Sequence, residues 1–224
     1  MEINKKSLKV QAYNYLKDCI IRGKFEYDKI YTEVNIAKEL GISRTPIREA
    51  VLQLAHDDFV ELKPNKGFVV KSYSIEELRD YLDLRKAIEG FCGIYTIKTK
   101  DTERWQLLIG KLEENLNSME HELEGAHDPV EFMKIDSEFH FTLIDYAGNI
   151  QMTRIMRDLR DKIDRIGIES EQLANRCEET FAEHKAIVKA IKEGDKDAIV
   201  NAYGYHFEKC FEAMTGCENI HNIA

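Results

Sequence analysis

Apolar residues recur every three to four positions through most of the first 58 residues, which is the spacing of amphipathic helices. This spacing predicts three helices, over 8–21, 32–40 and 43–58. The apolar face expected for the first helix is made of Val10, Tyr13, Leu16, Ile20 and Ile21. The face expected for the third is made of Ile47, Ala50, Val51 and Leu54.

The next segment changes from a helical to a strand pattern. Residues 59–63 alternate between apolar and polar, and residues 68–70 are apolar and β-prone. Residues 64–67, Pro-Asn-Lys-Gly, have the composition of a hairpin turn. Three helices followed by a two-stranded hairpin predict a winged helix-turn-helix, with Lys66 and Gly67 at the tip of the wing.

From residue 74 onward the pattern is helical throughout. Ser74 followed by Glu77 forms a capping box sequence, which marks a helix start. Further helices are expected over 75–98, 102–124, 128–147, 150–173, 178–193 and 195–215, separated by turn and cap residues. The predicted fold is therefore mainly α, with a winged domain over 1–72 and an all-α antiparallel helical bundle over 73–220.

The third predicted helix carries exposed arginines at its start. Gly41 suits the turn before it, Ser43 suits the N-cap, where its hydroxyl would accept a backbone N–H, and Pro46 suits the first turn. Arg44, Thr45 and Arg48 then lie off the apolar stripe. This is the end of a recognition helix that enters the major groove of DNA. The alternative is an ordinary solvated charged face.

Charge is distributed unevenly along the chain. The formal net charge is −9, but residues 1–71 hold 13 Lys and Arg against 10 Asp and Glu, which leaves 72–224 with 19 against 31. A mildly basic first domain is compatible with binding phosphates. The five cysteines are scattered, without a CxxC pair, so neither a disulfide framework nor a zinc finger is expected. The sequence shows no signal peptide or long apolar run, and we expect a soluble, cytoplasmic protein.

Four polar residues of the bundle fall on helix faces that are otherwise apolar. They are Asp136, His140, His184 and His206. A carboxylate and an imidazole at i and i+4 can hold one ion together, and a histidine from each of two other helices would complete the set. Such ligands suit Zn²⁺, and also Ni²⁺, Co²⁺, Mn²⁺ or Fe²⁺. The alternative is a group of hydrogen-bonded core histidines.

Arg85 is a further candidate on the first bundle helix. It could face the same cavity and hold a carboxylate ligand through two parallel hydrogen bonds. A salt bridge to Glu89, one turn on, is an equally good interpretation.

The sequence resembles the GntR family of bacterial transcription regulators, in the subfamily with an FCD effector domain. The match rests on residues 43–50 (SRTPIREA), on the wing residues 64–67, and on residues 136–140 (DSEFH) with the later His184 and His206. The resemblance implies that Asp136 and these three histidines bind a metal.

The resemblance also implies partners. It implies a homodimer on a palindromic operator, with Arg44 and Arg48 contacting bases or phosphates, Thr45 helping, and Gly67 allowing the wing to approach the minor groove. Val34 stands where some relatives carry another arginine, so that contact is not expected. Six bundle helices resemble the VanR-type branch, which implies a small organic acid effector on the metal, near Arg85.

Taken together, these features predict a DNA-binding repressor controlled by a small carboxylate, and not an enzyme. Two other functions stay open at this point. Histidines and a carboxylate around a metal also describe metal-dependent oxygenases, although no separate general base is evident. A zinc ion with a purely structural role would fit the same ligands.

Overall fold

The computed structural model describes residues 7–125, 128–159 and 176–215, and it divides the chain into two compact units, Met1–Ser72 and Tyr73–Ala224. The predicted mainly α fold with a two-stranded wing is confirmed. In the described part, no helix is long and apolar enough to span a membrane. Residues 160–173 of the helix expected over 150–173, and the cysteine Cys217, lie outside the described residues.

The first unit begins with three helices, α1 (Leu8–Ile21), α2 (Glu33–Leu40) and α3 (Arg44–His56). Gly41 takes a left-handed conformation with φ of 65°, which ends α2 and turns the chain into α3. Ser43 occupies the N-cap of α3, but its side chain makes no capping hydrogen bond, contrary to expectation. Its hydroxyl therefore does not contribute the stabilisation that an N-cap usually provides.

The apolar face of α1 differs from the predicted one. Its buried residues are Ala12, Leu16, Cys19 and Ile20. Val10, which was assigned to this face, is 41% exposed. A face that contains Leu16 and Ile20 extends back to Ala12 at i−4, whereas Val10 is two residues away and points elsewhere.

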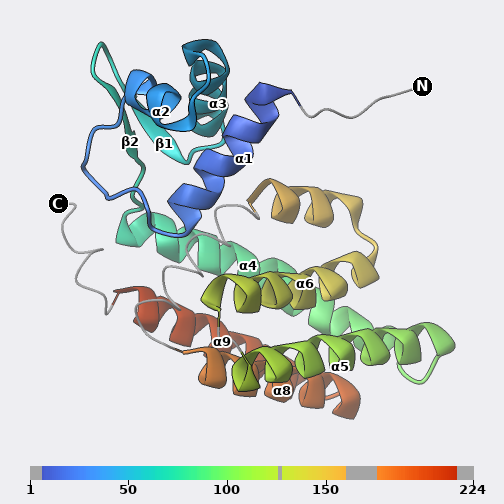
Figure 1. Cartoon of the computed structure of the whole chain (residues 1–224). Helices are drawn as coiled ribbons and strands as arrows, with labels where there is room; N and C mark the ends of the chain where they lie inside the picture. Colours follow the sequence, from blue (N-terminus) through green and yellow to red (C-terminus); the bar gives the residue numbers. More distant parts are fainter. Residues whose placement is uncertain (1–6, 126–127, 160–175, 216–224) are drawn as a thin grey trace, which may run out of the picture. The chain divides into compact units, whose positions relative to one another are not determined.

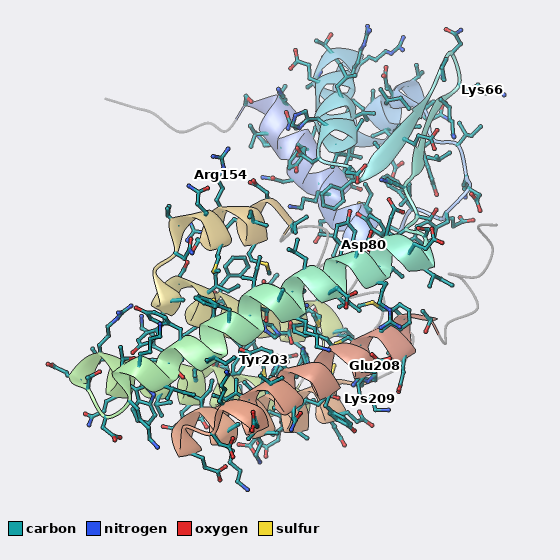
Figure 2. The ribbon with its side chains drawn as sticks, turned by 180° about the vertical axis from the view of Figure 1, so that it is seen from behind. Lys66, Asp80, Arg154, Tyr203, Glu208 and Lys209 are labelled. Carbon is teal, nitrogen blue, oxygen red and sulfur yellow. The ribbon has the colours of Figure 1, made fainter. Side chains whose placement is uncertain are left out.

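The wing is an antiparallel hairpin of β1 (Val60–Lys63) and β2 (Gly67–Val70), in which Lys63 pairs with Gly67. Figure 2 shows Lys66 at the tip of this hairpin. The backbone of Tyr31 bonds in both directions to Phe68. The hairpin is thereby tied to the segment before α2, and Phe68 is fully buried in the core of the unit.

The second unit is a helical bundle. Its elements are α4 (Ile75–Tyr95), a 3₁₀ turn η1 (Thr96–Thr99), α5 (Glu103–Glu124), α6 (Pro129–Ala147), helical residues 150–159, α8 (Cys177–Glu193) and α9 (Lys196–Thr215). The capping box at Ser74 is formed as predicted. Helices joined by short turns run back alongside each other (Figure 1). Among them, α4 packs against α6 and α9, and α8 packs against α5 and α9.

The α4–α9 contact is especially close at Gly93. A Cβ atom there would lie 2.8 Å from the ring of Tyr203 and 2.9 Å from Ile199. Figure 2 shows Tyr203 between these two helices. This close packing places buried polar residues of α4 and α9 beside those of α6 and α8, where the candidate metal ligands lie.

Candidate functional site

Asp136, His140, His184 and His206 come from three helices and are all buried. Their exposed fractions are 4%, 2%, 0% and 1%. Asp136 and His140 lie one turn apart on α6, while α8 supplies His184 and α9 supplies His206. One ring nitrogen of each histidine lies within 4.8 Å of the other two. The structure thus brings together the four residues that the sequence pattern selects.

The distances at this cluster fit a single ion. Nε2 of His140 lies 3.2 Å from Nε2 of His184. Oδ1 of Asp136 lies 3.4 Å from Nε2 of His184 and 3.7 Å from Nε2 of His140. Two donors that are each about 2.0–2.1 Å from one metal stand roughly 2.9–3.4 Å apart at angles of 90–109°. Only small movements would therefore bring these three atoms onto one ion.

The other nitrogen of each imidazole lies close to a partner outside the cluster. Nδ1 of His206 lies 2.8 Å from Oε2 of Glu183, and Nδ1 of His184 lies 3.4 Å from the sulfur of Met119. Nδ1 of His140 lies 2.5 Å from Oε2 of Glu89. Protein metal sites commonly hold the second nitrogen of a ligating histidine in this way, which fixes the orientation of the ring.

The contact between His140 and Glu89 is close but imperfect. Although the two atoms are 2.5 Å apart, each is buried without a hydrogen bond of acceptable geometry. A rotation of the ring would complete that bond, and a metal on Nε2 would fix the rotation. These buried polar atoms therefore also fit a site that accepts an ion.

Glu89 and Glu183, which contact the outer ring nitrogens, are each paired with an arginine. Nε of Arg85 donates to Oε1 of Glu89 over 2.8 Å, and Nη2 of Arg176 donates to Oε1 of Glu183 over 2.5 Å. The salt bridge between Arg85 and Glu89, which was one of two interpretations of Arg85, is thus present. Burial alone would raise the pKa of Glu89, but Arg85 and His140 together lower it to about 2.

The imidazoles differ in their affinity for protons. Burial lowers the pKa of His184 well below its ordinary value, and it lowers the pKa of His206 to about 3. Burial also disfavours the charged form of His140, but Glu89 and then Asp136 outweigh it, so its pKa is raised. Neutral imidazoles are the form that binds metals, and two of the three are neutral in this environment at pH 7.

The partners Glu89, Glu183, Arg176 and Met119 were not assigned to this site from the sequence. Glu89 was considered only as a salt-bridge partner of Arg85. One signal was available, because Glu89 and Glu183 lie on buried helix faces where a carboxylate requires a partner. Arg176 and Met119 carried no comparable signal, since an arginine before a helix and a buried methionine are both ordinary.

The second candidate surface lies at the start of α3. Arg44, Thr45 and Arg48 are exposed, and together with Glu49 and Leu52 they line a shallow hollow of about 370 Å³. Nε of Arg44 lies 2.8 Å from Oε2 of Glu33, at the start of α2. Two exposed guanidinium groups one turn apart at a helix start can contact phosphates or guanine edges.

At the wing, Lys66 is exposed and Gly67 is partly buried. Gly67 has a φ of 129°, and a Cβ atom there would lie 2.0 Å from the carbonyl oxygen of Tyr31. The structure therefore requires glycine at this position for packing within the unit, independently of any contact with DNA.

Comparisons with known proteins agree with this architecture. Residues 8–70 match the bacterial regulatory proteins of the gntR family, and residues 80–209 match the FCD domain. The uncharacterized HTH-type transcriptional regulator YdhC of Bacillus subtilis is 26% identical over 214 residues, 96% of this chain and 91% of that protein. The HTH-type transcriptional repressor RspR of Escherichia coli is 24% identical over 204 residues, 91% of this chain and 87% of that protein.

A crystal structure of a GntR-type putative transcriptional regulator from Rhodococcus sp. RHA1 superimposes with a TM-score of 0.73 at 20% identity. It covers 94% of this chain and 99% of that one. The similarity to this structure concerns the fold, whereas the two domain matches identify the family. With the winged domain preceding the helical domain, the chain belongs to the GntR family of transcriptional regulators with a C-terminal FCD domain, and it is not an enzyme.

Proposed function

We propose that this regulator is a repressor whose operator binding is controlled by a small carboxylate, held at a divalent metal inside the bundle. The observation that carries the proposal is the convergence of Asp136 Oδ1 and the histidine nitrogens in a buried core. Repressor function is also suggested by the name of the Escherichia coli relative RspR. We place this action in the cytoplasm, where bacterial DNA is accessible.

Three imidazoles and one carboxylate are suited to Zn²⁺ or Ni²⁺, with Mn²⁺, Co²⁺ and Fe²⁺ as further candidates. Bound there, the metal would supply a Lewis acid with positions open to oxygen ligands. The chain's own residues orient the site. Glu89 and Glu183 hold two of the rings, and Phe139 stacks on His184 with ring centroids 4.2 Å apart.

Arg85 is the residue we assign to the carboxylate of the effector. It is only 6% exposed, and its guanidinium lies over the ring of Phe207 at 4.9 Å. Its bond to Glu89 uses Nε, and a guanidinium has two terminal amino groups besides. A planar fork of this kind matches a carboxylate. The bundle helices of the described residues also suit the VanR-type branch, for which a small acid is expected.

On DNA, we assign Arg44, Thr45 and Arg48 to the major groove and Lys66 to the backbone or minor groove. A helix-turn-helix regulator reads a palindromic site as a symmetric dimer. Exposed Leu84 and Phe91 lie two turns apart on α4 and support a homodimer contact on that helix. Effector binding would alter the spacing of the two winged units, and such coupling typically amounts to about 1–3 kcal/mol.

The test uses untagged full-length protein. Elemental analysis is expected to find about one metal per chain, and thermal shift against a panel of small carboxylates is expected to single out one acid. That acid should then change the affinity for DNA fragments enriched by the protein from a random pool. A protein without metal, even after reloading, would contradict the proposal.

A structural metal is the second candidate, and it is favoured by the near-complete burial of the ligands. In that case, removing the ion would unfold the bundle. Under the sensing function, the stripped protein should stay folded by circular dichroism and lose only its response to the acid.

A further inference from the structure

Cys210 lies one turn after His206 on α9, and its sulfur is 3.9 Å from Nε2 of His206. Because Nδ1 of His206 is engaged by Glu183, Nε2 is the nitrogen that remains for a metal. The sulfur is therefore on the metal side of the ring. Cys210 is half-buried, unlike the other described cysteines, Cys19, Cys92 and Cys177, which are buried.

The charged groups around Cys210 are those of the same site. Burial raises the pKa of the Cys210 thiol to about 12, while the positive charges of Arg85 and Arg176 lower it and the negative charges of Asp136 and Glu183 raise it. Independently of the cysteine, three buried imidazoles, that of His206 among them, each place one nitrogen within 4.8 Å of the other two. Cys210 is thus an additional soft donor next to a cluster of nitrogen and oxygen donors.

We propose that Cys210 is a further ligand of the metal, a proposal that rests on the metal site described above. On binding, the sulfur would donate a lone pair to the ion and its proton would pass to solvent, with no change in oxidation state. A sulfur about 2.3 Å and a nitrogen about 2.0–2.1 Å from one zinc are roughly 3.1–3.6 Å apart at 90–109°. The observed 3.9 Å between this sulfur and Nε2 of His206 would have to shorten by roughly 0.3–0.8 Å.

A thiolate ligand would change which metals the protein retains. Sulfur favours Zn²⁺ and Co²⁺ over Mn²⁺, whereas carboxylate and imidazole ligands alone discriminate less. The competing interpretation is that Cys210 simply fills space as a small apolar residue. The two interpretations differ in whether a metal–sulfur bond exists.

Cobalt substitution of the full-length protein tests this directly. We expect wild-type protein stripped with chelator and loaded with Co²⁺ to show visible d–d bands and a near-ultraviolet sulfur-to-cobalt charge-transfer band. Cys210→Ser should keep the d–d bands and lose the charge-transfer band. Cys92→Ser is the matched control, since Cys92 is a buried thiol of the same bundle, and it should retain both.

The outcomes separate the two proposals. Visible d–d bands without the charge-transfer band in wild-type protein would overturn the role of Cys210 and leave the metal site intact. Absence of both would remove the metal site and this inference with it. Zinc X-ray absorption on the wild-type protein needs no variant, and it should show one sulfur at about 2.3 Å. A spectrum with only nitrogen and oxygen neighbours would contradict the proposal.

Discussion

Nε2 of His140 lies 3.2 Å from Nε2 of His184, in a core where both rings are at most 2% exposed. Two imidazole nitrogens at this distance either share a proton or share an ion. Burial lowers the pKa of His184 well below the ordinary value, so its ring is neutral, and a neutral ring nitrogen can accept a hydrogen bond from His140 or bind an ion. An ion between them would satisfy both nitrogens at once.

His140→Ala should lose the metal. It removes the donor closest to Nε2 of His184 and, with it, the chelate formed with Asp136 one turn earlier. The metal content by elemental analysis should fall from about one ion per chain to a small fraction of that. His121→Ala is the control, because His121 is an exposed histidine near the end of α5. Equal metal content in the two variants would refute the assignment.

Glu89→Gln should destabilise the bundle and weaken metal binding together. Glu89 is fully buried and is shared by Arg85 and His140. Leaving a buried arginine unpaired costs about 3–5 kcal/mol, and loss of a carboxylate that orients a ligand typically lowers metal affinity about 10–100-fold. Denaturant unfolding and metal competition measure the two effects.

Glu208→Gln is the matched control for that variant. Glu208 pairs with Arg79, another arginine of α4, over 3.3 Å, but both side chains are more than 40% exposed. An exposed pair of this kind contributes about 0–1 kcal/mol. If Glu89→Gln and Glu208→Gln lowered the free energy of unfolding equally, burial would not be the reason that the Arg85–Glu89 pair stabilises the bundle.

Tyr13→Phe should destabilise the winged unit in a pH-dependent way. The hydroxyl of Tyr13 donates to Oδ2 of Asp57 over 2.7 Å, joining α1 to the end of α3. Burial raises the pKa of Asp57, but hydrogen bonds from His56, Tyr13 and Gln53 outweigh this and lower it below 3.8. A carboxylate with a lowered pKa contributes stability above its unfolded pKa and loses it as the pH falls.

Tyr13→Phe should therefore lower the free energy of unfolding by about 1.5 kcal/mol near neutral pH. This loss should shrink as the pH is lowered below the ordinary pKa of 3.8. Calorimetry of the full chain at several pH values measures it. Tyr15→Phe is the control on the same helix, because Tyr15 is 42% exposed. A loss that does not depend on pH would contradict a role for the carboxylate.

Arg48→Ala should abolish specific DNA binding without unfolding the protein. Arg48 is exposed on α3, and a bidentate contact of arginine with a base contributes about 1–3 kcal/mol of discrimination. Binding to fragments selected by the wild type should drop accordingly in a titration at fixed salt. Lys24→Ala, a basic residue in the turn after α1, is the control for charge alone. Unchanged specific binding by Arg48→Ala would refute its role.

Gly67→Ala should destabilise the wing far more than Gly41→Ala. Both glycines have positive φ, but a Cβ atom at Gly67 would lie 2.0 Å from the carbonyl oxygen of Tyr31, whereas Gly41 has no such atom within 4 Å. Gly41→Ala should cost about 1–2 kcal/mol for its left-handed backbone. Thermal unfolding compares them. An equal loss of stability in the two variants would mean that the backbone of Tyr31 moves away from the added Cβ atom at no cost.

The local pattern of residues predicted much of this protein. Helical spacing, the glycine at position 41 and the capping box at Ser74 depend on neighbours within a few residues, so the sequence predicts helices and their order. The observed helix ends differ from the predicted ones by only a few residues. For example, the helix expected to reach residue 98 ends at Tyr95 and is followed by the 3₁₀ turn η1. Even the inward placement of Asp136 and His140 follows from helical periodicity.

The sequence by itself thus determined the fold class, the exposed arginines of α3 and the set of inward histidines. Only the tertiary structure decided which nitrogen of each ring faces the centre, that Glu89 and Glu183 contact the rings, and that the sulfur of Cys210 lies beside Nε2 of His206. It also decided that the carbonyl oxygen of Tyr31 leaves no room for a Cβ atom at Gly67. These contacts join segments far apart in the chain, and they depend on how helices pack against one another, which no local periodicity encodes.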